Sequence, residues 1–215
     1  MPRGRAVLGY PEGMTNDDIA GLLLAAGGGR RLGGQPKALL THRGRPLVEH
    51  AVRALREGGC GTVHVVLGAG RDGVRATADL RGCAVVGNPD WETGMGSSLR
   101  AGLASLAGSG ARAALVTLVD QPGVGAAAVA RVLGVAGCDP DGMTSALAAA
   151  AYGGRRGHPV LLGADRWTDV AGLAVGDQGA RAYLAAHEAE LTLVECGDVA
   201  RAYDIDTPAD LRRLD

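Results

Sequence analysis

The sequence predicts a single α/β domain in which helices cover both faces of a mostly parallel central sheet. Short apolar runs alternate with segments of helical periodicity along most of the chain, which is typical of such sheets. The apolar runs are nearly continuous, as expected for parallel strands buried on both faces. The chain has 215 residues, of which 47% are hydrophobic and 21% charged, so it is long enough for one packed core.

The first half of the chain alternates regularly between the two patterns. The run IAGLLLA is the first predicted strand, and the helix after it has Pro46 at its start and Gly58 at its end. Ser97 and Ser98 are good N-caps, and we expect them to open a later helix. The predicted strands are 19–25, 62–68, 83–88 and 113–120, and the predicted helices are 46–59, 74–80, 97–108 and 125–136.

After residue 140 the rhythm changes. In TPADLRRL, Thr207 is a good N-cap, Pro208 a good first helical residue and Asp210 a suitable partner in a capping box. The predicted strands are 143–152, 158–163 and 191–196, and the predicted helices are 179–190 and 207–214. No linker is long enough to divide the chain, so we expect one domain over 19–215, preceded by a disordered tail or misassigned start at 1–18.

Composition excludes several classes of protein. Lys and Arg together number 22 and Asp and Glu 23, for a formal net charge of -1, and aromatic residues are only 3%, so a nucleic-acid partner is not expected. No apolar run reaches the length of a membrane span, and the apolar stretch before Pro11 is too short for a signal peptide. We therefore expect a cytoplasmic protein without a membrane partner.

The four cysteines are far apart in the sequence and form no CxxC pair. They are Cys60, Cys83, Cys138 and Cys196. This spacing favours neither a zinc site nor a disulfide framework, and we expect mostly buried, reduced thiols.

The segment LLLAAGGGRRLGGQPKALL, residues 22–40, leaves a buried strand and enters a glycine-rich, positive loop. Its spacing fits neither the dinucleotide fingerprint nor the P-loop. Glycines still allow backbone N–H groups to point at an anion, and Arg31 and Lys37 can neutralise phosphate charge. The alternative is a flexible surface turn with solvated charges. A position directly after the first strand favours ligand binding, because ligands of open α/β sheets lie at the carboxyl ends of strands.

The segment LAAGGGRRLGGQPKALL resembles the L-A-A-G-x-[SG]-x-R-[ML]-G-x-x-K signature of nucleotidyltransferases that attach a nucleotide to the molybdenum cofactor. Lys37 stands one residue later than in the shortest form of that signature. Further matching blocks follow in order, from about residue 20 to the end: NPDWETGMGSSLRAGL, LVDQPGV, YGGRRGHPVLLG, GDQGAR and DIDTPADL. The resemblance points to the cytidylyltransferase branch. It implies a Rossmann-like nucleotidyltransferase domain with a nucleotide-binding half at 19–140 and an acceptor or pterin half at 141–215.

Asp120 follows the most strand-like run of the chain and precedes Gln121 and Pro122. A carboxylate at the carboxyl end of a central strand is well placed for a hard cation, and a turn-initiating Asp is the alternative. The resemblance implies that Asp120 binds Mg²⁺, with Mn²⁺ possible, and that Asp206 helps to hold it. Arg31, Lys37 and Asp120 form the implied catalytic set.

The resemblance also implies two binding sets. Ala26 gives the L-A-A-G pattern that cytidylyltransferases of this family tend to carry, where guanylyltransferases tend to carry L-A-G-G, so CTP is the predicted nucleotide. The nucleotide-binding set is Ala25, Ala26, Gly27, Gly28, Gly29, Arg31, Lys37, Asn88 and Ser98. The acceptor-binding set is His158, Asp177, Gly179 and Arg181. Without the resemblance, His158 reads equally well as a strand-edge residue and Arg181 as a solvated helix residue.

The implied reaction joins CMP from CTP to the terminal phosphate of molybdopterin and releases pyrophosphate. A phosphate monoester has a second pKa near ~6, so the nucleophile is mostly ionised at neutral pH and needs no general base. The alternatives are a guanylyltransferase for the same cofactor, a transferase for another phosphorylated acceptor, and a non-catalytic molybdopterin carrier. The resemblance further implies a transient contact with a molybdenum hydroxylase of the xanthine dehydrogenase type.

Overall fold

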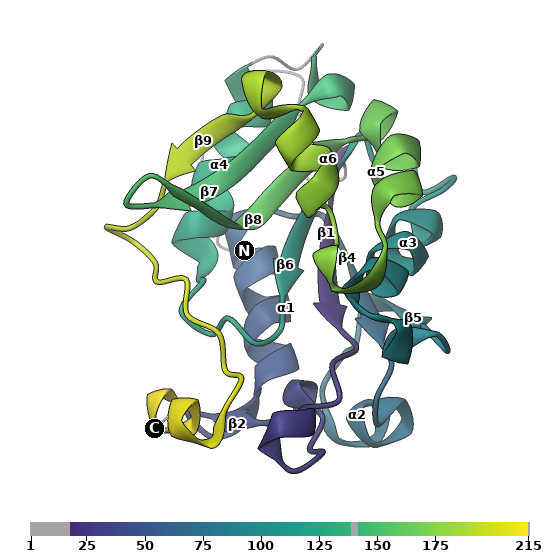
Figure 1. Ribbon diagram of the computed structural model, residues 1–215, viewed down its shortest axis with the longest axis vertical. Coiled ribbons are helices and arrows are strands. Elements are labelled where there is room, and N and C mark those ends of the chain that lie inside the picture. Colours follow the sequence, from purple (N-terminus) through teal and green to yellow (C-terminus); the bar gives the residue numbers. More distant parts are fainter. Residues whose placement is uncertain (1–17, 139–141, 215) are drawn as a thin grey trace, which may run out of the picture.

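Seven strands form the central sheet of the computed structural model, which describes residues 18–138 and 142–214 (Figure 1). Their order is β5-β4-β1-β6-β8-β7-β9. The strands are β1 Ile19–Ala25, β4 Thr62–Leu67, β5 Cys83–Gly87, β6 Ala113–Leu118, β7 Leu147–Tyr152, β8 Arg155–Gly163 and β9 Thr192–Glu195. Strand β8 runs antiparallel to both β6 and β7, and the other pairings in this sheet are parallel. The predicted α/β class with a mostly parallel sheet is confirmed.

Helices cover both faces of the sheet (Figure 1). Strand β1 shows why its apolar run is continuous: Leu23 packs into the core beneath α1 and α4, while Leu22 and Leu24 pack into the core beneath α3, α5 and α6. The helices are α1 Leu47–Gly58, α2 Arg71–Thr77, α3 Met95–Ser105, α4 Ala126–Cys138, α5 Trp167–Leu173 and α6 Arg181–Ala186. No helix of the described chain is both long and apolar enough to cross a membrane.

Short elements connect these layers. Strands β2 Thr41–His42 and β3 Arg45–Pro46 form a small hairpin. His42 Nδ1 lies 2.6 Å from the carbonyl oxygen of Leu214, so this hairpin contacts the C-terminal segment (Figure 1). The 3₁₀ turns are η2 Arg30–Leu32, η3 Lys37–Leu39, η4 Trp91–Thr93, η5 Met143–Ser145, η6 Ala164–Arg166, η7 Gly176–Gln178, η8 Glu188–Glu190 and η9 Pro208–Arg213.

The start of α3 corrects the predicted capping by serines. The helix begins at Met95 with Gly94 in the N-cap position, and no side chain caps it. Ser97 and Ser98 are the third and fourth residues of the helix and are buried. The Ser97 hydroxyl lies 2.9 and 2.8 Å from the carbonyl oxygens of Asp90 and Gly94, and its single proton can be donated to either. The helix starts earlier than predicted because Gly94, with φ 110°, lets the chain turn into it directly.

Several other elements differ from the sequence prediction. Helix α2 begins at Arg71 where residue 74 was predicted, and the first three residues of the strand predicted at 143–152 form the turn η5. The helix predicted at 179–190 divides into α6 and the turn η8. The helix predicted at 207–214 is the 3₁₀ helix η9, although its capping box between Thr207 and Asp210 is present as predicted. Helix α5 lies where no element was predicted: it has seven residues and only Val170 is buried, too short for a periodic signal. The predicted tail falls on residues 1–17, outside the described chain, apart from Asp18.

Candidate functional site

The glycine-rich loop folds back on itself at the carboxyl end of β1. The backbone N–H groups of Leu32 and Gly34 both donate to the carbonyl oxygen of Gly29, at 2.7 and 3.0 Å. The N–H of Lys37 donates to the carbonyl oxygen of Gly27 at 3.2 Å. Gly29 has φ +57°, and a Cβ at this position would lie 2.1 Å from the carbonyl oxygen of Gln35. The loop therefore requires glycine at residue 29, and its closure places Lys37 beside Gly27.

The C-terminal segment brings two further carboxylates to the end of β6. The backbone N–H of Ile205 donates to the carbonyl oxygen of Asp120 at 2.9 Å, and the Ile205 side chain is fully buried. Asp204 and Asp206, on either side of Ile205, are thereby held next to Asp120. The capping box fixes the next turn, because the Asp210 carboxylate accepts from the Thr207 N–H at 2.9 Å and from the Thr207 hydroxyl at 2.7 Å.

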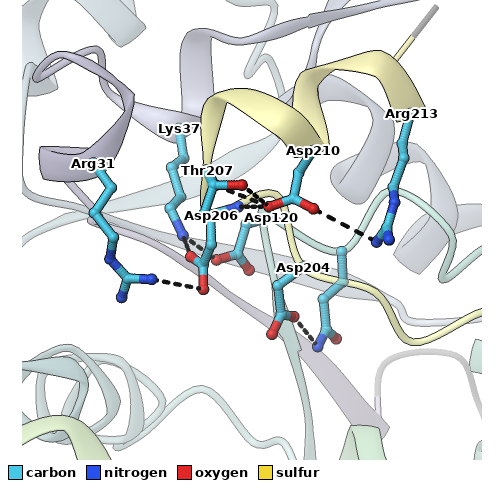
Figure 2. Close-up of polar contacts among 9 residues, drawn as sticks. Arg31, Lys37, Asp120, Asp204, Asp206, Thr207, Asp210 and Arg213 are labelled. Carbon is cyan, nitrogen blue, oxygen red and sulfur yellow. Dashed lines mark hydrogen bonds and ion pairs between the residues drawn. The ribbon is translucent and has the colours of Figure 1, made fainter.

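An ionic centre joins these segments (Figure 2). The Lys37 ammonium donates to Asp120 Oδ2 at 2.6 Å and to Asp206 Oδ1. Arg31 lies further out, with an N–O distance of 3.7 Å to Asp206 and a side chain that is 72% exposed. At that exposure the ion pair contributes little to stability, and Arg31 is able to turn toward a bound anion. Asp204 is held separately, since Gln121 Nε2 donates to its Oδ1 at 2.8 Å.

Burial and charge act against each other within this centre. Burial lowers the pKa of the Lys37 ammonium, but the charges and hydrogen bonds of Asp120 and Asp206 outweigh it and raise the pKa above its ordinary value. Burial raises the pKa of the Asp120 carboxyl, and Lys37 only partly offsets this increase. The carboxylates of Asp204 and Asp206 raise the pKa of Asp120 further. The Lys37 ammonium thus offsets only part of the negative charge that Asp120, Asp204 and Asp206 bring to this end of the sheet.

The residues of this centre line a cavity of about 670 Å³. Most of the predicted nucleotide and metal residues line this cavity, and so does Asp177 from the predicted acceptor set. These residues are Ala26, Gly27, Gly28, Gly29, Arg31, Lys37, Ser98, Asp120, Asp177 and Asp206. The predicted catalytic set is therefore brought together with both predicted metal ligands.

Two predicted nucleotide residues do not line the cavity. Ala25 is the last residue of β1 and is 1% exposed. Asn88 is buried, and its Nδ2 donates to the hydroxyls of Ser97 and Ser98 at 2.8 and 3.0 Å. Asn88 thus orients Ser98, which does line the cavity, and itself lines a second hollow of about 440 Å³.

Three predicted acceptor residues also lie away from the cavity wall. Gly179 is buried against Met95, and Arg181 begins α6. His158 lies in β8, where burial lowers the pKa of its imidazole to about 4, with an opposing contribution from Asp204. Among the described residues, the structure therefore brings only Asp177 of this set to the cavity.

Sequence reasoning missed several cavity residues. No role is assigned to Asp204 from the sequence, although its two-residue spacing from Asp206 in DIDTP is a usable signal in an extended segment. Arg30 belongs to the same basic loop as Arg31. Trp91, Glu92 and Met95 were not assigned roles, and they also line the cavity.

The donor set fits a hard divalent cation. Asp120 and Asp206 both bind the Lys37 ammonium, so their oxygens already converge on one positive charge. Within residues 18–138 and 142–214, no group of three or more His, Cys, Asp or Glu side chains forms a metal site on its own. Mg²⁺ is usually bound by one or two carboxylates, with phosphate and water oxygens completing the octahedron. The site therefore suits a cation shared with a phosphate ligand.

Comparison with known proteins agrees with this geometry. The family model described as MobA-like NTP transferase domain matches residues 21–191. A nicotine blue oxidoreductase of Paenarthrobacter nicotinovorans is 41% identical over 203 residues, covering 91% of this chain and 96% of that protein. A molybdenum cofactor guanylyltransferase of Rhodobacter capsulatus is 28% identical over 207 residues, covering 92% of this chain and 95% of that protein.

Solved structures share the fold. Rv0371c of Mycobacterium tuberculosis H37Rv is 30% identical, with a TM-score of 0.78, over 94% of this chain and 98% of that one. A crystal structure of the Mycobacterium tuberculosis protein in complex with manganese is 28% identical, with a TM-score of 0.74, over 92% of this chain and 97% of that one.

Proposed function

The chain belongs to the MobA-like NTP transferase family, and on that premise we propose that it transfers CMP from CTP to the terminal phosphate of molybdopterin. One observation carries the proposal: Lys37, Asp120 and Asp206 meet beside a closed glycine loop in a single cavity. This is the arrangement needed to bind a triphosphate and a divalent cation together.

The glycine loop and its cations serve the triphosphate. The backbone at Gly27 and Gly28 borders the cavity without side chains, so phosphate oxygens can approach it closely. Lys37 lies next to this backbone and offsets charge on the phosphates that leave. Arg31, mostly exposed, turns in from the rim to do the same. Catalysis then comes from positioning and charge neutralisation.

The bond changes need no protein base. An oxygen of the molybdopterin phosphate attacks the α-phosphorus of CTP, the bond from that phosphorus to the bridging oxygen breaks, and pyrophosphate leaves with the electron pair. The attacking phosphate is mostly ionised at neutral pH, since its second pKa is near ~6. No side chain therefore has to accept a proton from the attacking group.

Asp120 and Asp206 would hold the divalent cation, which we propose to be Mg²⁺. The manganese complex of the mycobacterial relative supports a divalent cation in this fold, with Mn²⁺ as an alternative. When bound, the cation supplies positive charge to the triphosphate. Lys37 must then exchange at least one carboxylate for a phosphate oxygen, because both carboxylates bind its ammonium in the structure.

The base and the acceptor remain part of the proposal. Ala26 lines the cavity and carries the L-A-A-G pattern that suggests CTP, whereas the Rhodobacter capsulatus relative supports GTP as the alternative. Of the predicted acceptor residues, Asp177 lines the cavity. We propose that His158, Gly179 and Arg181 contribute to acceptor binding without lining it. We also propose a nucleotide-binding half at 19–140 and an acceptor half at 141–215. Transfer to another phosphorylated acceptor and a carrier role are alternatives to the proposed reaction. A transient contact with a hydroxylase of the xanthine dehydrogenase type is part of the proposal.

A second candidate function follows from a single observation. The relative named nicotine blue oxidoreductase is 41% identical over 91% of this chain. In that case the chain would catalyse an oxidation or reduction, for which a reduced nicotinamide nucleotide is a common hydride donor.

One experiment separates the two candidates. Purified protein is incubated with molybdopterin, Mg²⁺ and CTP, GTP, ATP or UTP in turn, and pyrophosphate is measured. A parallel series follows the absorbance of reduced nicotinamide nucleotide with a quinone dye. Pyrophosphate release with CTP alone supports the cytidylyltransferase, and release with GTP alone moves the chain to the guanylyltransferase branch. Nucleotide oxidation without pyrophosphate release supports the oxidoreductase, and molybdopterin binding without either reaction supports a carrier.

A further inference from the structure

Trp91 lines both of the hollows described above. It lies in the turn η4 between β5 and α3, and it lines both the cavity of about 670 Å³ and the hollow of about 440 Å³. The chain has two tryptophans. The other, Trp167, has a structural contact, because its indole N–H donates to the carbonyl oxygen of Leu162 at 2.9 Å. Trp91 is half-buried and is one of the residues that line the cavity.

The Trp91 side chain packs closely against the backbone of two glycines. A Cβ on Gly28 would lie 2.9 Å from both Cη2 and Cζ3, at the far end of the ring. A Cβ on Gly68 would lie 2.4 Å from Cβ and 2.5 Å from Cγ of Trp91, at the base of the side chain. The indole therefore extends from the end of β4 to the glycine loop. It occupies space that any side chain at either position would take.

We propose that Trp91 is the stacking platform for the nucleobase of the bound triphosphate. This inference rests on the proposed function. The ring tip touches Gly28, within the loop proposed to hold the phosphates, so a base joined to the α-phosphate through its ribose is within reach of the indole. Ala26 lies on the same side, since its Cβ would be 2.9 Å from a Cβ on Gly68. The platform and the residue predicted to select the base are thus neighbours.

The Trp91 indole is chemically suited to stack on a flat nucleobase. An indole already fixed by packing loses little conformational freedom when a base stacks on it. Stacking tolerates every base, because every base has a π-face, so Trp91 sets affinity and orientation and leaves selection to hydrogen-bonding groups around it. Glu92 is the next residue of the same turn and also lines the cavity, and its carboxylate can accept from an amino group of the base.

Nucleotide binding measured by calorimetry and by tryptophan fluorescence tests the proposal. The proteins are the wild type, Trp91→Phe, Trp91→Ala and the matched control Trp167→Phe. The probes are CTP, GTP and inorganic tripolyphosphate, each with Mg²⁺. We expect the nucleotide that binds to quench the fluorescence of the wild type and of Trp167→Phe, but not that of Trp91→Phe. We expect Trp91→Ala to weaken nucleotide binding about 5- to 150-fold, which is the range for loss of one stacked base. Tripolyphosphate should bind every variant equally.

The outcomes are distinct. Quenching that persists in Trp91→Phe, equal quenching by tripolyphosphate, or unchanged nucleotide affinity in Trp91→Ala would overturn the role of Trp91 while leaving the proposed reaction intact. Absence of binding by both nucleotides in the wild type would overturn the reaction and the platform together. If Trp91→Ala does not fold, Trp91→Leu serves instead, because it keeps an apolar side chain at this position without a flat ring, and the same loss of nucleotide affinity is expected.

Discussion

At the scale of single residues, the candidate site is centred on Lys37, whose ammonium forms ion pairs with two carboxylates. Lys37 is 14% exposed, and Asp120 and Asp206 bind it from segments that lie far apart in the sequence. Removing one partner of such a centre leaves the remaining charges uncompensated, so each substitution changes both the charge balance and the geometry. Substitutions here should therefore be judged by activity and stability together.

Asp120→Asn should abolish turnover that depends on the divalent cation and leave the fold intact. The amide keeps the shape of the side chain but removes the negative charge that the cation needs. Pyrophosphate release across a Mg²⁺ titration, with circular dichroism as the measure of folding, checks this expectation. The matched variant is Asp204→Asn, whose carboxylate binds Gln121 and not Lys37 and which should retain more activity. Near-normal rates in Asp120→Asn would remove Asp120 from the metal site.

Lys37→Ala should raise KM for the triphosphate and lower kcat, because the ammonium offsets charge on both the bound phosphates and the leaving pyrophosphate. We expect at least a tenfold loss in kcat/KM, the equivalent of ~1.4 kcal/mol. Arg30→Ala is the matched control, since Arg30 lines the same cavity without an ion pair to either Asp120 or Asp206 among the described contacts. An equal loss in both variants would mean that only the overall positive charge of the loop matters.

His158 should make stability depend on pH. Its pKa in the folded protein is about 4, below the ordinary 6.5, because burial disfavours the charged ring and Arg156 adds to this, while Asp204 opposes it. Between these two values the unfolded chain binds a proton that the folded chain does not. The free energy of unfolding therefore falls as pH falls below about 6.5, by at most ~1.4 kcal/mol per pH unit.

Urea unfolding at a series of pH values from about pH 7 to pH 5 measures this slope. His158→Gln should make this slope shallower. The substitution should not remove the slope entirely, because burial also lowers the pKa of His64. An unchanged slope in His158→Gln would show that folding does not change the pKa of this imidazole.

At the scale of elements, the glycine loop owes its shape to backbone contacts that tolerate no side chain at residue 29. Gly29 and Gly33 both have positive φ, at +57° and +77°, but only Gly29 is sterically closed. A Cβ at Gly29 would meet the carbonyl oxygen of Gln35 at 2.1 Å, whereas a Cβ at Gly33 meets nothing within 4 Å. The two positions therefore separate backbone preference from steric exclusion.

Gly33→Ala should destabilise the protein by only ~1–2 kcal/mol, the cost of a left-handed conformation for a residue with a Cβ. Gly29→Ala should cost more and should also weaken triphosphate binding, because the loop must open to relieve the clash. Urea unfolding and calorimetric titration with tripolyphosphate measure the two effects. Equal losses in both variants would mean that the contact with Gln35 is not needed for the site.

The sequence predicted the order and type of the helices and strands better than the residues at which they begin and end. The strands were found because their apolar runs are buried on both faces, as Leu22 and Leu23 show in β1. The serines at the start of α3 were misread as caps because local propensity does not show that Asn88 and the turn before the helix would bury them. Helix α5 gave no signal because one buried residue cannot define a period.

The candidate site was predicted in part. Arg31, Lys37 and Asp120 follow from their positions after strands, and the resemblance added Asp206. Asp204 and Trp91 were missed because their roles arise from tertiary contacts: the Ile205 N–H that bonds to Asp120, and the two glycines beneath the indole. Neither contact leaves a local pattern in the sequence.

At the scale of the whole molecule, the C-terminal segment completes a site that the rest of the chain begins. Ile205 is fully buried and holds its neighbours beside Asp120 through one backbone hydrogen bond. Ile205→Ala should destabilise the protein by about 2–5 kcal/mol and weaken Mg²⁺ binding, since Asp206 loses its support. Ile205→Val, expected to cost about 0.5–1.5 kcal/mol, should keep the Mg²⁺ affinity. Loss of stability without loss of Mg²⁺ affinity in Ile205→Ala would show that Asp206 is positioned by other contacts.

The distance along the chain between Lys37 and its partners has a consequence for biosynthesis. Lys37 precedes Asp120 by 83 residues and Asp206 by 169. On the ribosome, the nascent glycine loop emerges long before either carboxylate, and its lysine stays without them while the intervening strands are translated. The loop that we propose to bind phosphate is thus translated before the carboxylates that we propose to hold the cation. A ribosome-bound chain stalled before Asp206 is therefore expected to lack the complete metal site, whatever its glycine loop binds.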